Sequence, residues 1–170
     1  DPEGLDVDLF GYQPAFDTFH TRSLIKIHDG CNNFCSYCLI PMVRGRATSR
    51  SDKDIYDNIR SVVDHGFKEI VLTGVNMGRY QYQDVNFEGL VENILNIDGD
   101  FRLRISSIEP DNFSDRFLRL FENEKLAPHM HICLQSGAEN TLKAMRRHYT
   151  AAEFKNMCER IKPTIPAFNI

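Results

Sequence analysis

The chain has 170 residues, which suits one domain, and 42% of them are hydrophobic, enough for a packed core. Its formal net charge is −4, so contact with a nucleic acid would need a local basic patch rather than a global field. No apolar run approaches membrane-spanning length, and the acidic N-terminus lacks the basic start and apolar middle of a signal peptide. We therefore expect no membrane partner.

Five cysteines are present, three of them clustered at positions 31–38 and two isolated, Cys133 and Cys158. A secreted disulfide framework would more often show an even set spread along a short chain, so we expect reduced thiols in a cytoplasmic protein. Cys133 and Cys158 are expected to be core residues, because buried cysteine behaves as a small apolar side chain. The chain opens without methionine and closes on "IPAFNI", which reads as the start of a strand, so we expect a fragment of a longer protein.

Strand and helix signals alternate along most of the chain, after a connector at 1–22 that lacks a clear period. Ser51 predicts one helix start, and Thr150 with Glu153 forms a capping-box pair at another. In chain order we expect a strand at 23–30, a loop at 31–50, a helix at 51–66, a strand at 69–74, a helix at 87–95, a strand at 102–107, a helix at 114–123, a strand at 131–137, helices at 139–147 and 150–161, and the start of a strand at 167–170.

Such alternation predicts an α/β fold with a parallel sheet covered by helices. No G-x-G-x-x-G follows the first strand, so a dinucleotide-binding fold is disfavoured and a barrel-like sheet is the better expectation. Each predicted strand leads into polar residues, which the carboxyl edge of a parallel sheet would gather in one place. These are Cys31, Cys35 and Cys38 after the first strand, Gly74 and Asn76 after the second, Glu109 after the third, and Gln135 and Ser136 after the fourth.

The spacing C-x3-C-x2-C leaves a metal site one ligand short of four. A structural zinc ion would need a fourth donor, for which His28 and His65 lack finger-like spacing, and a redox C-x-x-C would leave Cys31 without a role. A 4Fe-4S cluster held by three thiolates has one open iron, which the amino and carboxylate groups of S-adenosylmethionine could chelate. An electron from the cluster could then cleave the sulfonium and give an adenosyl radical.

The pattern resembles the radical S-adenosylmethionine enzymes, and the longer segments resemble their methylthiotransferase branch. Those segments are "DGCNNFCSYCLIPMVRGRATSR" (29–50), "EIVLTGVNMGRY" (69–80), "RLRISSIEP" (102–110) and "HICLQSGAENTLKAMRRHYT" (131–150). Members of this branch modify isopentenyl-adenosine in tRNA, threonylcarbamoyladenosine in tRNA, or an aspartate of a ribosomal protein. "RGRATSR" and "SSIEP" look most like the threonylcarbamoyladenosine type.

The resemblance implies a partial TIM-like barrel over 23–170, truncated at its C-terminal end, and roles for individual residues. Cys31, Cys35 and Cys38 would ligate the cluster. The residues implied around S-adenosylmethionine are Gly74 and Asn76 at its methionine end, Glu109 toward the ribose or substrate, Gln135 and Ser136 facing the pocket, and Arg146 or Arg147 pairing with its carboxylate.

The resemblance also implies the reaction and its partners. One S-adenosylmethionine would methylate sulfur, and another would yield the radical that abstracts hydrogen from adenosine C2 of tRNA. A reductant and a sulfur donor would be needed. Full-length members add an N-terminal domain with a second 4Fe-4S cluster and a C-terminal RNA-binding module. Because both are absent here, we expect this chain to bind its cofactors without completing methylthiolation.

The sequence leaves the roles of several residues open. Arg44, Arg46 and Arg50 would contact tRNA phosphates, or else pair with the acidic helix start at Asp52 and Asp54. Phe34 and Tyr37 would shield the cluster or simply pack. A zinc-stabilised RNA-binding module without catalysis is the alternative from another functional class.

Overall fold

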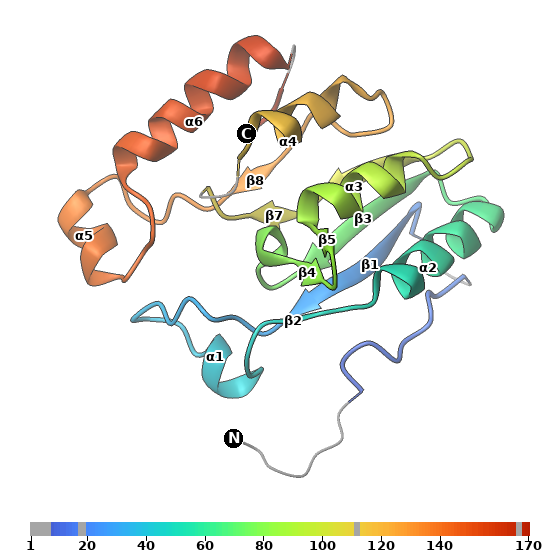
Figure 1. Ribbon diagram of the computed structural model, residues 1–170, viewed down its shortest axis with the longest axis horizontal. Coiled ribbons are helices and arrows are strands. Elements are labelled where there is room, and N and C mark those ends of the chain that lie inside the picture. The colour runs from blue at the N-terminus through green and yellow to red at the C-terminus, as the bar shows by residue number, and fades with distance from the viewer. Residues whose placement is uncertain (1–7, 17–19, 111–112, 166–167) are drawn as a thin grey trace.

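The computed structural model describes residues 8–16, 20–110, 113–165 and 168–170 (Figure 1). Its strands are β1 (Arg22–Asp29), β2 (Thr48–Ser49), β3 (Glu69–Gly74), β4 (Gln81–Tyr82), β5 (Val85–Asn86), β6 (Arg102–Ile105), β7 (Ser107–Ile108) and β8 (His131–Ile132). Its helices are α1 (Ile40–Val43), α2 (Asp52–Asp64), α3 (Phe87–Leu95), α4 (Asp115–Arg119), α5 (Glu139–Ala144) and α6 (Ala151–Thr164), with 3-10 turns η1 (Met77–Arg79) and η2 (Leu120–Glu122).

The central sheet has the order β2-β1-β3-β6, in which β1, β3 and β6 are parallel and β2 is antiparallel to the end of β1. The chain of β6 continues past Ser106 into β7, which pairs in parallel with β8. The successive strands therefore curl into a half-barrel, with helices along its outer side (Figure 1). This arrangement confirms the predicted α/β class and barrel-like sheet.

Three predicted strands differ from the structure in their extent. The strand expected at 102–107 is interrupted at Ser106, where the sheet bends from β6 to β7. The strand expected at 131–137 ends at Ile132, and Gln135 adopts a left-handed φ of 64° that is incompatible with an extended strand. The strand expected at 167–170 appears as a single parallel bridge between His129 and Asn169, while residues 166–167 lie outside the described part of the chain.

The helices begin where short polar side chains satisfy their first backbone N–H groups. Ser51, Asn86 and Ser114 accept hydrogen bonds at the starts of α2, α3 and α4, and Thr150 forms the expected capping box with Glu153 at α6. These caps confirm the predicted helix starts at Ser51, Ser114 and Thr150.

The core lies between the sheet and the helices α2 and α3. The apolar face of α2 contributes Ile55, Ile59 and Val62, all fully buried, against the buried strands β1 and β3. A chain of contacting aromatic rings extends this core toward α4 and the C-terminal bridge, formed by Phe87, Phe113, Phe117, Phe121 and Phe168. Among the described residues, no helix is both long and apolar enough to cross a membrane.

Candidate iron–sulfur and cofactor site

The three clustered cysteines lie on one loop at the carboxyl end of β1. The loop departs at Gly30, whose φ is +65° and where a Cβ atom would come within 2.0 Å of the Arg46 carbonyl oxygen. The backbone N–H of Cys31 donates to the carbonyl of Gly45 (3.2 Å), which ties the two ends of the loop together. A glycine is therefore required where the chain leaves the sheet for the cysteines.

An ion-pair network holds the start of this loop. Arg44 donates to both carboxylate oxygens of Asp29 at 2.7 Å, and Lys26 also pairs with Asp29, whose side chain is only 2% exposed. Burial alone would raise the pKa of Asp29, but hydrogen bonds from Arg44, Lys26 and the Gly30 backbone lower it to about 2. The ionised Asp29 carboxylate therefore stabilises the start of the loop, and the Arg44 guanidinium is paired with it.

The far side of the loop is fastened to α5, which is distant in sequence. Ser36 donates its backbone N–H to the carbonyl of Met145 (3.2 Å) and its hydroxyl to that of Ala144 (2.9 Å). Cys35 is buried within this contact, whereas Cys31 and Cys38 are half-exposed. The middle cysteine therefore faces the protein while the outer two border solvent.

Two of the three cysteine sulfurs have N–H donors within hydrogen-bonding distance. Cys31 Sγ lies 3.4 Å from the backbone nitrogen of Asn33 and 3.8 Å from Asn76 Nδ2. Cys35 Sγ accepts from Arg147 Nη1 at 3.2 Å. Iron–sulfur clusters in proteins typically receive hydrogen bonds at their sulfur atoms from nearby N–H groups. The donor chemistry of the loop thus fits an iron–sulfur cluster. Among the described residues, no three His, Cys, Asp or Glu side chains are grouped closely enough to hold a single metal ion.

Asn76 is the predicted residue with the clearest unmet bonding capacity. It is 5% exposed, and its Oδ1 is one of the described buried side-chain atoms without a partner. An unpaired buried oxygen is costly, so the atom suits an N–H donor that comes from outside the chain. Gly74 precedes it at the end of β3, where a Cβ atom would approach the His28 carbonyl oxygen to 2.8 Å. This corner therefore combines close backbone packing with an acceptor beside Cys31, which fits the amino group of a ligand.

Glu109 and Arg147 form an ion pair at the opposite side of the cysteine loop. The Arg147 side chain is 4% exposed and that of Glu109 is 18% exposed. Burial works against the charged form of Arg147, but hydrogen bonds with Tyr149 and Cys35 raise its pKa above the ordinary arginine value. Tyr149, which was not among the predicted site residues, also donates to the backbone carbonyls of Cys133 and Leu134.

No hydrogen bond or ion pair in the described structure joins the remaining predicted cofactor residues to the cysteines. Gln135 is exposed, and Ser136 accepts from the Ala138 backbone (3.1 Å) within its own turn. Arg146 is exposed with a left-handed φ of 56°, and this turn directs Arg147 rather than Arg146 into the site. The structure thus distinguishes between the two arginines that were equivalent in sequence.

The three arginines predicted to contact phosphates have different environments. Arg44 pairs with Asp29 rather than with Asp52 or Asp54, and Arg46 is exposed with its guanidinium over the Phe34 ring at 4.7 Å. Arg50 is 5% exposed, stacks on Tyr12, and bonds to Asn58 when that amide is turned to face it. Because so little of Arg50 is exposed, a phosphate contact is less favoured for it than for Arg46.

In the described part of the chain, neither histidine considered as a zinc donor belongs to a group of three or more side chains that could hold a metal ion. His28 is 1% exposed in β1, and burial lowers its pKa. His65 stacks on Phe16 at a centroid distance of 3.8 Å and bonds through Nδ1 to the Ser61 carbonyl.

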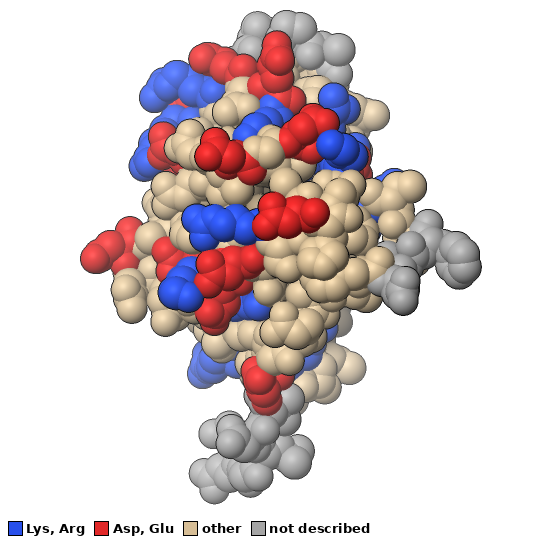
Figure 2. All heavy atoms as spheres, turned by 90° about the vertical axis from the view of Figure 1, so that its right-hand side faces the viewer, with Lys and Arg blue, Asp and Glu red and all other residues tan. Residues whose placement is uncertain are grey.

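The face shown in Figure 2 mixes acidic and basic side chains, so its described residues form no continuous basic area.

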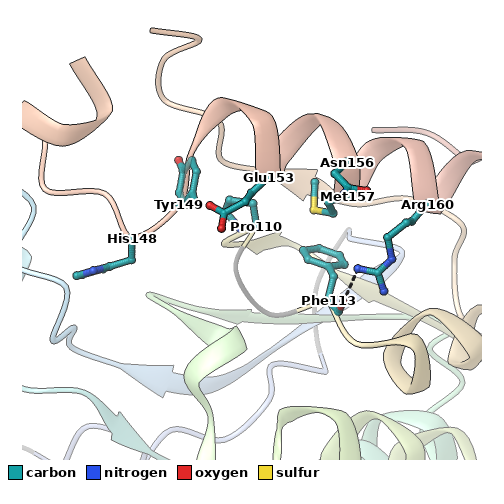
Figure 3. Close-up of a pocket in the computed structure, with 8 residues that line it drawn as sticks. All are labelled: Pro110, Phe113, His148, Tyr149, Glu153, Asn156, Met157 and Arg160. Atoms are coloured by element: carbon teal, nitrogen blue, oxygen red, sulfur yellow. Dashed lines mark hydrogen bonds between the residues drawn. The ribbon is translucent and has the colours of Figure 1, made fainter. Parts of the chain in front are cut away.

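A pocket of about 360 Å³ lies between the segment after β7 and α6 (Figure 3). Three of the polar side chains that line it, Tyr149, Glu153 and Arg160, are engaged within the chain. Glu153 caps α6 through Thr150, and Arg160 bonds to the Phe113 carbonyl (3.2 Å) and to Asp115 (2.6 Å). Tyr149 lines this pocket and accepts a hydrogen bond from Arg147 Nε at 3.2 Å, so the pocket adjoins the candidate site.

The chain is similar in sequence to proteins whose names describe the modification of tRNA. The chain is 37% identical over 168 residues to a threonylcarbamoyladenosine tRNA methylthiotransferase of Chlamydia pneumoniae, covering 94% of this chain and 40% of that protein. It is 39% identical to the protein of that name in Bacillus subtilis (92% and 36% covered). It is 36% identical to a tRNA-2-methylthio-N(6)-dimethylallyladenosine synthase of Endomicrobium trichonymphae (86% and 35% covered). The chain therefore spans about two fifths or less of the length of these relatives.

Solved structures share the fold at low sequence identity. The cobalamin-dependent S-adenosylmethionine radical enzyme OxsB matches with a TM-score of 0.67 at 11% identity, over 86% of this chain and 22% of that one. The radical S-adenosylmethionine methyltransferase TsrM from Kitasatospora setae matches with a TM-score of 0.65 at 18% identity, over 81% and 28%. The model of the radical SAM superfamily matches residues 25–170, nearly all of the chain past the connector. Such a family implies a 4Fe-4S cluster and S-adenosylmethionine, and the chain belongs to the radical SAM superfamily.

Proposed function

We propose that this chain is the radical SAM portion of a tRNA methylthiotransferase, in which Cys31, Cys35 and Cys38 ligate a 4Fe-4S cluster with one iron open to S-adenosylmethionine. The observation that carries the proposal is the cysteine loop at the carboxyl edge of the sheet, where two sulfurs receive nitrogen donors. The curated relatives, which match over most of this chain, carry methylthiotransferase names and support the same reading.

The chain's own residues would orient the ligand and limit solvent at the site. The bound cluster would supply the electron for reductive cleavage of S-adenosylmethionine. Asn76 Oδ1 would accept a hydrogen bond from the cofactor's amino group, which satisfies an otherwise unpaired buried atom. The burial of Cys35 behind Arg147 would keep water from one side of the centre.

For the substrate, we favour tRNA that carries threonylcarbamoyladenosine. The support is the name of the relatives in Chlamydia pneumoniae and Bacillus subtilis, together with the segments "RGRATSR" and "SSIEP". The similar identity to the dimethylallyladenosine synthases makes isopentenyl-adenosine tRNA the second candidate. Offering both tRNAs to the full-length protein, with a ribosomal-protein aspartate as a third substrate, distinguishes these possibilities by which product gains a methylthio group.

We further propose that the complete reaction needs parts that the longer relatives contain. These would include a second 4Fe-4S cluster in an N-terminal domain, a sulfur donor, a reductant and an RNA-binding module. On this proposal the chain alone binds its cofactors but does not methylthiolate tRNA. Methylthiolated tRNA produced by the chain alone would contradict it.

The direct test is anaerobic reconstitution with iron and sulfide, followed by metal analysis and spectroscopy with and without S-adenosylmethionine. We expect about four irons per chain and a spectrum that shifts when the cofactor is added. Replacing any one of Cys31, Cys35 and Cys38 by alanine should abolish both results. Cys133→Ala is the matched control, because that thiol lies outside the loop. Zinc uptake without iron uptake would instead support a structural zinc site in an RNA-binding module.

A further inference from the structure

Arg147 uses all three of its guanidinium nitrogens to connect separate parts of the site. Nη1 lies 3.2 Å from Cys35 Sγ and 3.5 Å from the Tyr37 hydroxyl, and Nε donates to the Tyr149 hydroxyl at 3.2 Å. Nη2 donates to the carboxylate of Glu109. A single side chain therefore joins the middle cysteine to the segment that follows β7.

The backbone places this guanidinium with little freedom. The left-handed turn at Arg146 ends α5, and the Arg147 N–H bonds back to the carbonyl of Leu142 at 3.0 Å. The Arg147 side chain is 4% exposed, and its carboxylate-binding side is occupied by Glu109. The described contacts of Arg147 are therefore all with groups of this chain, and its expected pairing with the carboxylate of S-adenosylmethionine stays a prediction.

We propose that Arg147 is a positioning residue for the iron–sulfur centre, with Glu109 as the partner that sets its orientation and offsets its charge. The guanidinium holds the Cys35 sulfur by an N–H···S hydrogen bond and presents a positive charge to it. The inference rests on the proposed cluster at the three cysteines. It does not depend on the choice of tRNA or on methylthiolation.

The contact has a predictable electronic consequence. A cluster gains one negative charge when it is reduced, so a cationic N–H donor at a ligand sulfur stabilises the reduced state and raises the reduction potential. Removing the donor should lower the potential. Removing the carboxylate of Glu109 should raise it, because the guanidinium charge is then no longer offset. Opposite shifts from two partners of one ion pair would not follow from a general loosening of the fold.

The experiment is a one-electron redox titration of the reconstituted protein without S-adenosylmethionine, followed by electron paramagnetic resonance. We expect Arg147→Gln to reduce the equilibrium constant for reduction about tenfold, which is about 59 mV toward negative potential. Glu109→Gln should shift it the opposite way, and Arg147→Lys should fall between Arg147→Gln and the unaltered protein. Lys143→Gln is the matched control, since this exposed residue carries the same charge near the end of α5.

A second readout starts from the unaltered protein and uses a variant that keeps the positive charge. The reduced cluster in protein labelled with 15N-arginine should show a 15N hyperfine coupling that disappears in Arg147→Lys. This readout decides the matter even if Arg147→Gln fails to take up iron.

Absence of the coupling in the labelled protein would overturn the inference. So would normal iron content with unchanged potentials in both Arg147→Gln and Glu109→Gln. A loss of S-adenosylmethionine affinity in Arg147→Gln without any shift in potential would instead assign Arg147 to the cofactor. If the unaltered protein takes up no iron, the proposed cluster itself fails and this inference fails with it, a result distinct from the others.

Discussion

At the scale of single residues, two glycines of the cysteine loop allow two costs of an alanine substitution to be measured separately. One is the cost of an unfavourable backbone conformation, and the other is the cost of a steric clash. Gly30 and Gly45 both have left-handed φ values, +65° and +74°. A Cβ atom would be 2.0 Å from the Arg46 carbonyl oxygen at Gly30, but would meet nothing within 4 Å at Gly45. Alanine at Gly45 should therefore cost only the conformational term, whereas alanine at Gly30 adds a clash with backbone.

We expect Gly45→Ala to lower the free energy of unfolding by about 1 kcal/mol and Gly30→Ala by about 3 kcal/mol. Urea unfolding of the metal-free protein measures both values. Gly30→Ala should also take up less iron on reconstitution, because the clash displaces the segment that leads to Cys31. Equal effects of the two substitutions would show that the close approach at Gly30 is relieved at little cost.

Arg46 and Arg50 provide a second comparison at this scale. Arg50→Ala should lower the free energy of unfolding by about 2 to 4 kcal/mol, because it removes a buried side chain and leaves Asn58 without its partner. Arg46→Ala should stay within about 0.5 kcal/mol, since its side chain is exposed. If RNA contacts this loop, only Arg46→Ala should weaken RNA binding in a correctly folded protein. Chemical denaturation and RNA titration of both variants test this pair.

At the scale of elements, the capping box of α6 should make a measurable contribution to the free energy of unfolding. Thr150 Oγ1 accepts from the Glu153 backbone at 3.1 Å, and the Glu153 carboxylate accepts from the Thr150 backbone at 2.7 Å. Thr150→Ala should lower the free energy of unfolding by about 1 kcal/mol. Thermal or urea unfolding measures the change, and an unaltered value would mean that water replaces the lost cap.

The same cap should respond to pH in a defined direction. Hydrogen bonds from the backbone and hydroxyl of Thr150 lower the pKa of Glu153 below its ordinary value. Its contribution to stability is therefore complete above the ordinary glutamate pKa and is lost as pH falls through the lowered value. Unfolding measured across acidic pH should show this dependence in the unaltered protein and less of it in Glu153→Gln. If Glu153→Gln shows the same pH dependence as the unaltered protein, the Glu153 carboxylate is not the source of that dependence.

At the scale of the whole molecule, the site connects parts of the chain that are far apart in sequence. Ser36 joins the cysteine loop to the end of α5, and Arg147 joins it to the segment after β7. Cluster binding should therefore slow amide hydrogen exchange in residues 31–45 and 142–149 together, because ordering the loop stabilises its partners. Amides of α2 should change little. Protection restricted to residues 31–45 would show that the two segments are not coupled.

The fold could be predicted to a large extent because its signals are local. The helix starts at Ser51 and Ser114 follow from side chains that cap nearby backbone groups, and the buried run at β3 follows from its composition. The bend at Ser106 was not predictable, because it depends on how the sheet curls around the whole core. The predicted strand at 131–137 was too long, because nothing local marks the left-handed residue Gln135.

The site was predictable only where residues are close in sequence. The spacing of Cys31, Cys35 and Cys38 can be read directly, but the helix pattern at 139–147 does not show which of two adjacent arginines faces inward. That choice depends on the left-handed turn at Arg146 and on the carboxylate of Glu109, contributed from elsewhere in the fold. The burial of Arg50 likewise depends on Tyr12 and Asn58, which lie 38 positions before it and 8 positions after it in the sequence.

The contact between Tyr12 and β1 has a consequence for how copies of the protein meet. An open sheet exposes backbone groups along its outer strand, which another chain can pair with. Here the Tyr12 hydroxyl bonds to both the N–H and the carbonyl of Lys26, and the Arg50 N–H bonds to the Ile27 carbonyl at 2.9 Å. These groups are thus unavailable for intermolecular strand pairing. Replacing one phenolic hydroxyl, as in Tyr12→Phe, would reopen this stretch of β1 and favour self-association at high protein concentration.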